Sequence, residues 1–266
     1  MTGTVITGTE KISFEVRGHV ALIGINRPDK MNAFDADMLA GIGRAYMHLH
    51  TNDDLRSGVL HGHGKAFTAG LDLMSLAGSL SEEGGPRPKD QLDPYGLETE
   101  PCSKPVVMAA HGRCYTLGIE LALSSDICVA AEGTVFAQLE VARGIFPFAG
   151  ASWRFAEQCG WGNAMRYVLT ADQFDAAEAL RIGLAQEITA PDHVLDRAVE
   201  IATRIAAMAP LGVRTTLAHA RKAATEGEAA AYADVAPKRV KAFASEDVQE
   251  GVAAMMERRE PNFQGR

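Results

Sequence analysis

The sequence lacks the features of a membrane-spanning or secreted protein. No run of 18 apolar residues occurs, and the first residues, MTGTVITGTEKISFEV, have no charged segment followed by an apolar run. Only four of the 266 residues are cysteine, with no C-x-x-C pair and no spacing typical of a disulfide framework. We therefore expect reduced thiols, no membrane association and a cytoplasmic location.

Basic residues are also fewer than acidic ones. The chain has 26 lysines and arginines against 34 aspartates and glutamates, which gives a net charge of -8 at pH 7. Such an acidic balance argues against a general affinity for nucleic acid or for anionic membranes, but it still permits a local basic pocket for an anionic small molecule. With 47% hydrophobic residues, the chain has enough apolar material for a substantial core.

Several catalytic and binding motifs are missing from the stretch HGHGKAFTAGLDL (61–73), which is rich in glycine and histidine. A phosphate loop requires Ser or Thr after its lysine, whereas Lys65 is followed by Ala66. His61 and His63 alternate at a predicted strand end and so point to opposite faces, and no Cys/His cluster lies nearby, so we predict no metal site. The chain also has no G-x-S-x-G elbow of a serine hydrolase.

The pattern of apolar residues predicts an α/β fold. Short runs rich in β-branched residues predict strands over 12–16, 20–26, 58–62, 105–112 and 126–131. Helical spacing occurs over 34–49 and 117–125, and from Pro191 to about Arg258 the sequence is helical throughout. Strands and helices therefore alternate in the first two thirds, and a helical region follows.

Two features of this pattern can carry chemistry. The turn AFTAGLD joins a predicted strand to a helix, and such a turn leaves backbone N–H groups free to hold an oxyanion. The alternative is a tight turn that simply requires glycine. Glu120 lies in the first turn of the apolar helix LGIELAL, and Glu140 lies near the start of another predicted helix. A carboxylate in apolar surroundings has a raised pKa that suits acid/base catalysis, although glutamate is also common at helix N-termini.

Four segments together resemble the enoyl-CoA hydratase/isomerase (crotonase) superfamily. NRPDKMNAFDADM (26–38) is similar to its N-R-P-x-x-x-N-A-[LF] segment, and GHGKAFTAGLDL (62–73) to its G-x-G-[KR]-A-F-x-A-G-x-D-[LI] turn. The block starting KPVVMAAHG (104–147) and the tail FASEDVQEGVAAMMERREPNF (243–263) are similar to its third and fourth motifs. The resemblance covers essentially the whole chain.

This resemblance implies the crotonase (ClpP-like) fold, a right-handed spiral of ββα units with a helical C-terminal trimerisation region. We expect residues 1–195 to form the acyl-CoA-binding and catalytic domain and residues 196–266 to form the oligomerisation region. Homotrimers, or hexamers made of two trimers, follow from the same resemblance.

The resemblance also assigns roles to residues. It places the two oxyanion-hole amides on Thr68 and Leu117, and the two hydratase glutamates on Glu120 and Glu140. Glu140 would protonate the α-carbon of a trans-2-enoyl-CoA while Glu120 activates the water, giving syn addition. The chain is closest in its site residues to enoyl-CoA hydratase. An acyl-CoA thioester is the expected partner and coenzyme A a part of the substrate, so no separate cofactor is expected.

Other assignments that follow from the resemblance concern substrate binding. Arg258 or Arg259 is a candidate to bind the phosphates of coenzyme A. The expected substrate-binding residues are Lys30, Ala33, Lys65, Ala69, Gly70, Leu71 and Phe148. Leu117 and Phe148 replace glycines of the family, which implies a reshaped acyl pocket or altered positioning of water. The alternatives are a Δ3,Δ2-enoyl-CoA isomerase, another crotonase-type acyl-CoA lyase, and a non-catalytic CoA- or RNA-binding relative.

Overall fold

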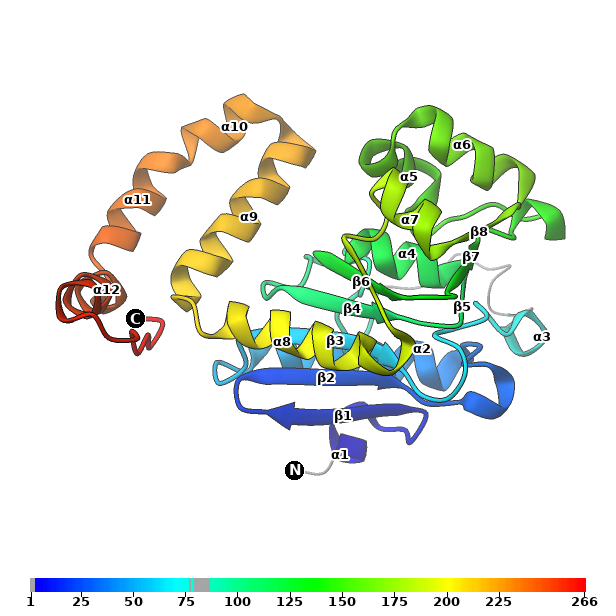
Figure 1. The fold of residues 1–266 in the computed structure, drawn as a ribbon, viewed down its shortest axis with the longest axis horizontal. Coiled ribbons are helices and arrows are strands. Elements are labelled where there is room, and N and C mark those ends of the chain that lie inside the picture. The colour runs from blue at the N-terminus through cyan, green and yellow to red at the C-terminus, as the bar shows by residue number, and fades with distance from the viewer. Residues whose placement is uncertain (1–2, 77, 79–86) are drawn as a thin grey trace.

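The main sheet forms the centre of the molecule (Figure 1). The computed structural model describes residues 3–76, 78 and 87–266. Six strands lie in the order β1-β2-β3-β4-β6-β9, in which only the β1–β2 pair is antiparallel. These strands are β1 (Ile12–Arg17), β2 (Val20–Ile25), β3 (Ser57–Gly62), β4 (Val106–Ala110), β6 (Ile127–Ala131) and β9 (Glu187–Thr189). The expected α/β class is confirmed, and the five predicted strands all form.

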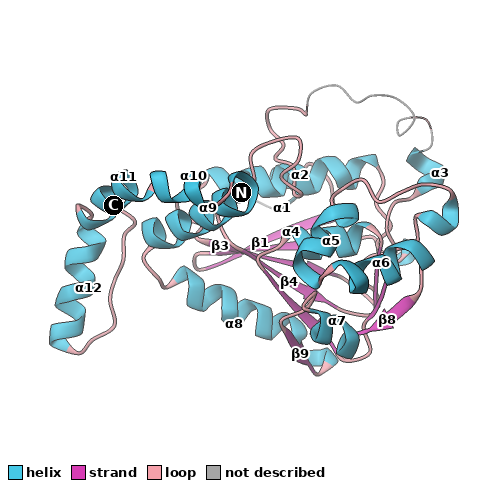
Figure 2. Ribbon diagram, turned by 90° about the horizontal axis from the view of Figure 1, so that it is seen from above, coloured by secondary structure: helices cyan, strands magenta, loops and turns pink. Residues whose placement is uncertain are grey.

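Helices cover both faces of this sheet, as Figure 2 shows from above. Because side chains alternate along a strand, Val59 and Val107 pack against α8 (Val194–Ala206) on one face. Leu60 and Met108 join the larger core on the other face, which includes α2 (Ala36–Thr51). The strands that are covered on both sides are almost wholly apolar, as expected for a buried parallel sheet.

A smaller sheet, in the order β5-β7-β8, stands beside the main one. Its strands are β5 (Arg113–Tyr115), β7 (Val135–Ala137) and β8 (Gln173–Asp175). The helices around it are α4 (Leu117–Ser124), α5 (Ala151–Cys159), α6 (Trp161–Thr170) and α7 (Ala176–Ile182). The remaining short elements are α1 (Gly3–Thr7), η1 (Pro28–Lys30), α3 (Leu73–Leu76), η3 (Val141–Arg143) and η4 (Pro191–His193). The predicted helices over 34–49 and 117–125 correspond to α2 and α4.

The C-terminal helices form an arm that leaves the body of the molecule (Figure 1). The arm consists of α9 (Pro210–Glu226), α10 (Glu228–Ala233), α11 (Val235–Phe243) and α12 (Glu246–Glu257). Its start differs from the expected boundary at residue 196, because Ala198, Ala202 and Ala206 of α8 are buried against the main sheet. The apolar stripe of α8 therefore belongs to the core, and the arm begins at Pro210.

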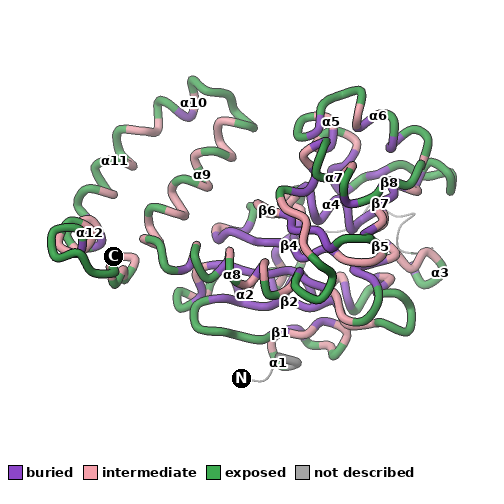
Figure 3. Tube along the Cα trace, in the orientation of Figure 1, coloured by how far each residue is buried: buried purple, intermediate pink, exposed green. Residues whose placement is uncertain are grey.

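Burial follows this division: Figure 3 shows β2, β4 and β6 largely purple and the arm largely exposed. All four cysteines are free thiols buried in the body, as the reduced-thiol expectation requires. Within the described ranges, no helix combines the length and the apolar character needed to cross a membrane.

Asn32 ties two distant turns together beside the sheet. Its side-chain Oδ1 accepts the Arg27 amide at 2.7 Å, and its Nδ2 donates to the carbonyls of His63 at 2.9 Å and Ala66 at 2.7 Å. Its own carbonyl accepts the Thr68 hydroxyl at 2.7 Å. The residue is fully buried and has a φ of 57°, a conformation that asparagine tolerates better than most residues. The turn after η1 and the turn after β3 are therefore fixed to each other by one side chain.

We expect Asn32→Ala to lower the free energy of unfolding by about 2–4 kcal/mol, because it leaves the part-buried Arg27 amide and His63 carbonyl and the buried Ala66 carbonyl without their partner. Urea denaturation followed by circular dichroism measures this loss. Asn26→Ala is the matched control, since Asn26 makes a single exposed side-chain bond to the Glu10 carbonyl. An equal effect of the two substitutions would contradict the role given to Asn32.

Candidate active site

The turn after β3 does not offer the amide that the sequence suggested. The Thr68 N–H donates to the Arg113 carbonyl at 3.0 Å, and the Tyr115 N–H donates back to the Thr68 carbonyl at 3.0 Å. Thr68 is fully buried in this parallel bridge to Cys114. The prediction that the Thr68 amide forms half of an oxyanion hole is therefore wrong, because that N–H already has an acceptor.

The free amide of this turn belongs to Leu71. Gly70 and Asp72 pair with Phe34: the Phe34 N–H donates to the Gly70 carbonyl at 2.8 Å, and the Asp72 N–H donates to the Phe34 carbonyl at 2.9 Å. Since the C=O and N–H of one peptide point in opposite directions, the Leu71 N–H faces away from Phe34. It has no acceptor within the part of the chain that the structure describes.

The second free amide lies on a neighbouring segment. Leu117 is the first residue of α4, where helix geometry leaves the N–H without a partner, and it finds none among the described residues. The residues that precede the two amides touch: a Cβ on Gly70, whose φ is 100°, would lie 1.9 Å from the Thr116 hydroxyl oxygen. Only glycine permits this approach, which brings the Leu71 and Leu117 amides to the same place.

Glu120 lies one turn further along α4 and is 3% exposed. One carboxylate oxygen, Oε1, accepts the Ala149 amide at 2.8 Å and the Ala151 amide at 3.3 Å. Burial raises the pKa of Glu120 to about 6, against the opposing effect of these two amides and of the Arg154 charge. Two backbone donors therefore fix the orientation of this carboxyl while burial moves its pKa toward neutrality.

Glu140 lies at the start of η3 and is 6% exposed. Gln138 Nε2 donates to its Oε1 at 2.9 Å, while its Oε2 is buried and has no partner among the described residues. Burial raises the pKa of Glu140 to about 7, and the neighbouring Glu120 charge adds to the increase. A buried oxygen without a partner is costly in a folded protein, so this atom is suited to bind a substrate or a water.

One cavity of about 450 Å³ collects these groups. Its lining is formed by Lys30, Met31, Ala33, Ala69, Leu71, Asp72, Leu73, Met74, Thr116, Leu117, Glu120, Glu140, Arg143, Ile145 and Phe148. The structure thus brings together both predicted glutamates and Leu117 with five of the seven predicted substrate-binding residues.

The other two predicted substrate-binding residues, Lys65 and Gly70, are not part of the lining. Lys65 is exposed, and Gly70 acts through its close approach to Thr116. At the end of α12, Arg259 pairs with Glu250 at 2.5 Å, so its charge is engaged within the arm. Arg258 caps the same helix and is likewise absent from the lining.

Sequence reasoning missed two functional groups. Leu71 was expected to bind substrate, but not to supply the free amide; the relevant signal is its position directly after the glycine of AGLD. Arg143 was not singled out at all. It lies three residues after Glu140 in the sequence, a spacing that places it one turn away in a 3-10 helix.

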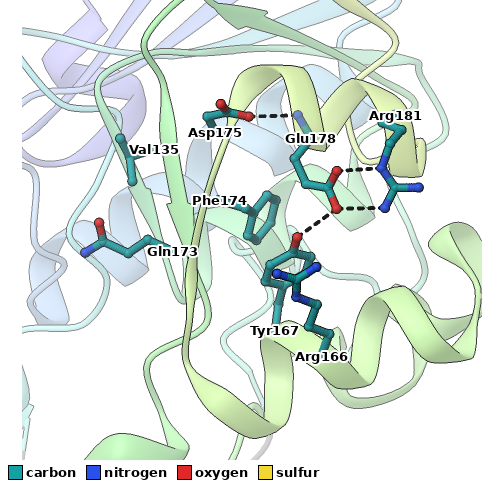
Figure 4. Close-up of a pocket in the computed structure, with 8 residues that line it drawn as sticks. All are labelled: Val135, Arg166, Tyr167, Gln173, Phe174, Asp175, Glu178 and Arg181. Carbon is teal, nitrogen blue, oxygen red and sulfur yellow. Dashed lines mark hydrogen bonds and ion pairs between the residues drawn. The ribbon is translucent and has the colours of Figure 1, made fainter.

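A larger surface hollow of about 740 Å³ lies between α6, β8 and α7 (Figure 4). Its carboxylates are both engaged: Asp175 caps α7 through the Glu178 amide, and Glu178 pairs with Arg181 and accepts the Tyr167 hydroxyl at 2.7 Å. Among the described residues, no three His, Cys, Asp or Glu side chains are placed to hold a metal ion. The 450 Å³ cavity is therefore the candidate active site.

Comparison with known proteins agrees with this geometry. The enoyl-CoA hydratase/isomerase family model matches residues 15–266. The chain is 31% identical to enoyl-CoA hydratase EchA19 of Mycobacterium tuberculosis over 99% of both chains, and 32% identical to the crotonyl-CoA hydratase of Syntrophomonas wolfei over 96% of this chain and 98% of that protein.

Solved structures give the same result. A probable enoyl-CoA hydratase/isomerase from Mycobacterium abscessus superposes with a TM-score of 0.94 at 48% identity, covering 97% of this chain and 99% of that one. An enoyl-CoA hydratase from Mycobacterium tuberculosis has a TM-score of 0.88 at 31% identity, covering 97% and 100%. Together with the two free amides and the two buried glutamates, these similarities show that the chain belongs to the enoyl-CoA hydratase/isomerase family.

Proposed function

We propose that the protein is an enoyl-CoA hydratase that adds water across the double bond of a trans-2-enoyl-CoA. The observation that carries this proposal is the placement of two buried glutamates and two free backbone amides on one cavity. Crotonyl-CoA and enoyl-CoA hydratases among the relatives are named for this reaction, which supports the same assignment here.

The amides would stabilise the charge that develops on the thioester. In this scheme the thioester oxygen accepts hydrogen bonds from the Leu71 and Leu117 N–H groups, which hold the enolate formed when water attacks the β-carbon. Removal of one such donor in comparable enzymes costs about 3–4 kcal/mol of transition-state stabilisation. Because these donors are main-chain groups, the leucine side chains are free to line the acyl pocket.

The two glutamates would divide the acid and base roles. Glu120, with the lower pKa of about 6, is mostly ionised at neutral pH and activates the water that attacks the β-carbon. Glu140, with a pKa of about 7, retains its proton longer and delivers it to the α-carbon. Both groups act on the same face of the substrate, so addition is syn. In this scheme coenzyme A is part of the substrate, and the acid/base steps use no further cofactor.

Isomerisation of a trans-3-enoyl-CoA is the second candidate. The unpartnered Oε2 of Glu140 favours it, because one carboxyl can remove a proton from the α-carbon and return it to the γ-carbon. Two rates decide between the candidates: formation of a conjugated thioester from trans-3-hexenoyl-CoA, and loss of conjugation from trans-2-hexenoyl-CoA. If the first rate is the higher, isomerisation is the better-supported function.

The exposed arm supports a proposal about assembly. We also propose homotrimers, which can pair into hexamers, because large apolar side chains on the arm face solvent in the single chain. Phe243 is 73% exposed, Met255 72% and Met256 77%. Large apolar side chains that remain exposed in a single chain are typical of a surface that another chain covers.

We expect Glu120→Gln and Glu140→Gln each to lower kcat for hydration of crotonyl-CoA by about 10²- to 10⁴-fold, since each removes one proton-transfer group. Loss of the conjugated-thioester absorbance measures the rate. Glu157→Gln, an exposed glutamate on α5, is the matched control and should keep full activity. Binding of butyryl-CoA by the two variants reports that the cavity is intact. Full activity in either variant would exclude the assigned role of that residue.

The pH dependence of kcat/KM should be bell-shaped, with apparent pKa values of about 6 and about 7. Activity falls below pH 6 because protonated Glu120 cannot accept a proton, and falls above pH 7 because ionised Glu140 cannot donate one. Stopped-flow hydration of crotonyl-CoA from pH 5 to 9 measures the profile. Affinity for butyryl-CoA over the same range separates binding from chemistry. A flat profile would contradict this division of roles.

The assembly proposal predicts a mass of three or six times the 28.4 kDa chain in light scattering after gel filtration. Phe243→Asp combined with Met256→Asp places charge on the apolar arm and should shift the protein to monomers, whereas Glu157→Gln leaves the assembly unchanged. A monomeric wild-type protein at micromolar concentration would refute the proposal.

A further inference from the structure

Arg143 places an unpaired positive charge on the wall of the active-site cavity. The structure gives its guanidinium no ion pair and no hydrogen bond among the described residues, although the charge lies near enough to oppose the rise in the pKa of Glu140. The residues beside it on the lining, Ile145 and Phe148, are apolar. Arg143, Ile145 and Phe148 are all exposed in the single chain, so the guanidinium is solvated there and is open to pair with an anionic group of a bound ligand.

The position of Arg143 relative to the reacting atoms limits what that anion can be. In the proposed reaction the thioester oxygen sits at the Leu71 and Leu117 amides, and the α- and β-carbons lie between Glu120 and Glu140. Acyl atoms beyond the β-carbon then continue along the wall that follows Glu140. Arg143, one 3-10 turn from Glu140, stands on that wall.

The other free cation of the lining belongs to a different wall. Lys30 ends η1, next to Met31, whose carbonyl accepts the Ala69 amide at 2.9 Å. This wall carries the turn that leads to Leu71, and in the proposed reaction we assign coenzyme A to it. The two cations therefore serve different parts of one ligand: Lys30 lies toward the coenzyme and Arg143 toward the acyl end.

We propose that Arg143 binds a carboxylate at the far end of the acyl chain, so that the preferred substrates are trans-2-enoyl thioesters of dicarboxylic acids. This inference rests on the proposed hydratase function for the position of the chain. A guanidinium can pair with a carboxylate through two parallel N–H···O bonds, which a lysine or a neutral side chain cannot reproduce.

Binding of unreactive thioesters tests the inference without relying on catalysis. Calorimetry compares glutaryl-CoA, which ends in a carboxylate, with hexanoyl-CoA, which is of similar length and neutral. Wild type should bind glutaryl-CoA more tightly, and Arg143→Met should reduce the affinity ratio of the two ligands by about tenfold to a hundredfold. Arg143→Lys should keep part of the preference. Lys30→Met is the matched control, since it should weaken both ligands equally and leave their ratio unchanged.

Kinetics extend the test to the reaction. The ratio of kcat/KM for glutaconyl-CoA to that for trans-2-hexenoyl-CoA should fall in Arg143→Met by the same factor, mainly through KM for glutaconyl-CoA. An equal loss for both substrates would assign Arg143 to the phosphates of coenzyme A and overturn the proposal. A shifted pH profile with an unchanged ratio of kcat/KM values would show that Arg143 acts on the ionisation of Glu140. That result would also overturn the proposal. If neither glutaconyl-CoA nor trans-2-hexenoyl-CoA is hydrated but glutaryl-CoA still binds through Arg143, the hydratase assignment fails and the carboxylate site stands.

Discussion

The close contact between Gly70 and Thr116 is the constraint on which the site depends. It joins two turns that are distant in the sequence, and it leaves the next residue of each turn with a free N–H directed at the cavity. The contact has a cost: Thr116 has a φ of 50°, unusual for a β-branched residue, and its buried hydroxyl has no partner among the described residues. Strain of about 1–3 kcal/mol persists only where the surroundings enforce it. Here the bridges of Thr68 and Leu71 on either side of Gly70 enforce it.

The two carboxyl groups of this cavity differ in their hydrogen-bond partners. Glu120 accepts two backbone amides through one oxygen, which stabilises its charged form, whereas Glu140 receives one side-chain donor and keeps a buried oxygen free. Burial raises both pKa values, and the repulsion between two like charges raises that of Glu140 further. Two carboxyl groups with different pKa values therefore follow from unequal hydrogen bonding in one desolvated space, as the proposed acid and base roles require.

The parts of this arrangement that are local in the chain could be predicted from the sequence. The strands and α2 follow from β-branched runs and helical spacing. Glu120 was found through the apolar helix around it, and Glu140 through its place beside a predicted helix start. The free amide could not be predicted, because it depends on pairing between segments far apart: Arg113 takes the N–H of Thr68, and Phe34 turns that of Leu71 toward the cavity. The same limit applies to α8, whose helical pattern is visible but whose packing against the main sheet is not.

The loop that follows η3 both holds Glu120 and contributes to the cavity wall. The Ala149 and Ala151 amides donate to Glu120, while Phe148 lines the cavity. A change in the backbone of this loop would therefore move the catalytic carboxylate together with the pocket wall. Substitution of side chains such as Phe148 and Arg143 alters the cavity wall without moving Glu120. Under the proposed function, the acyl preference therefore resides in those side chains, because the backbone of the same loop holds Glu120 in place.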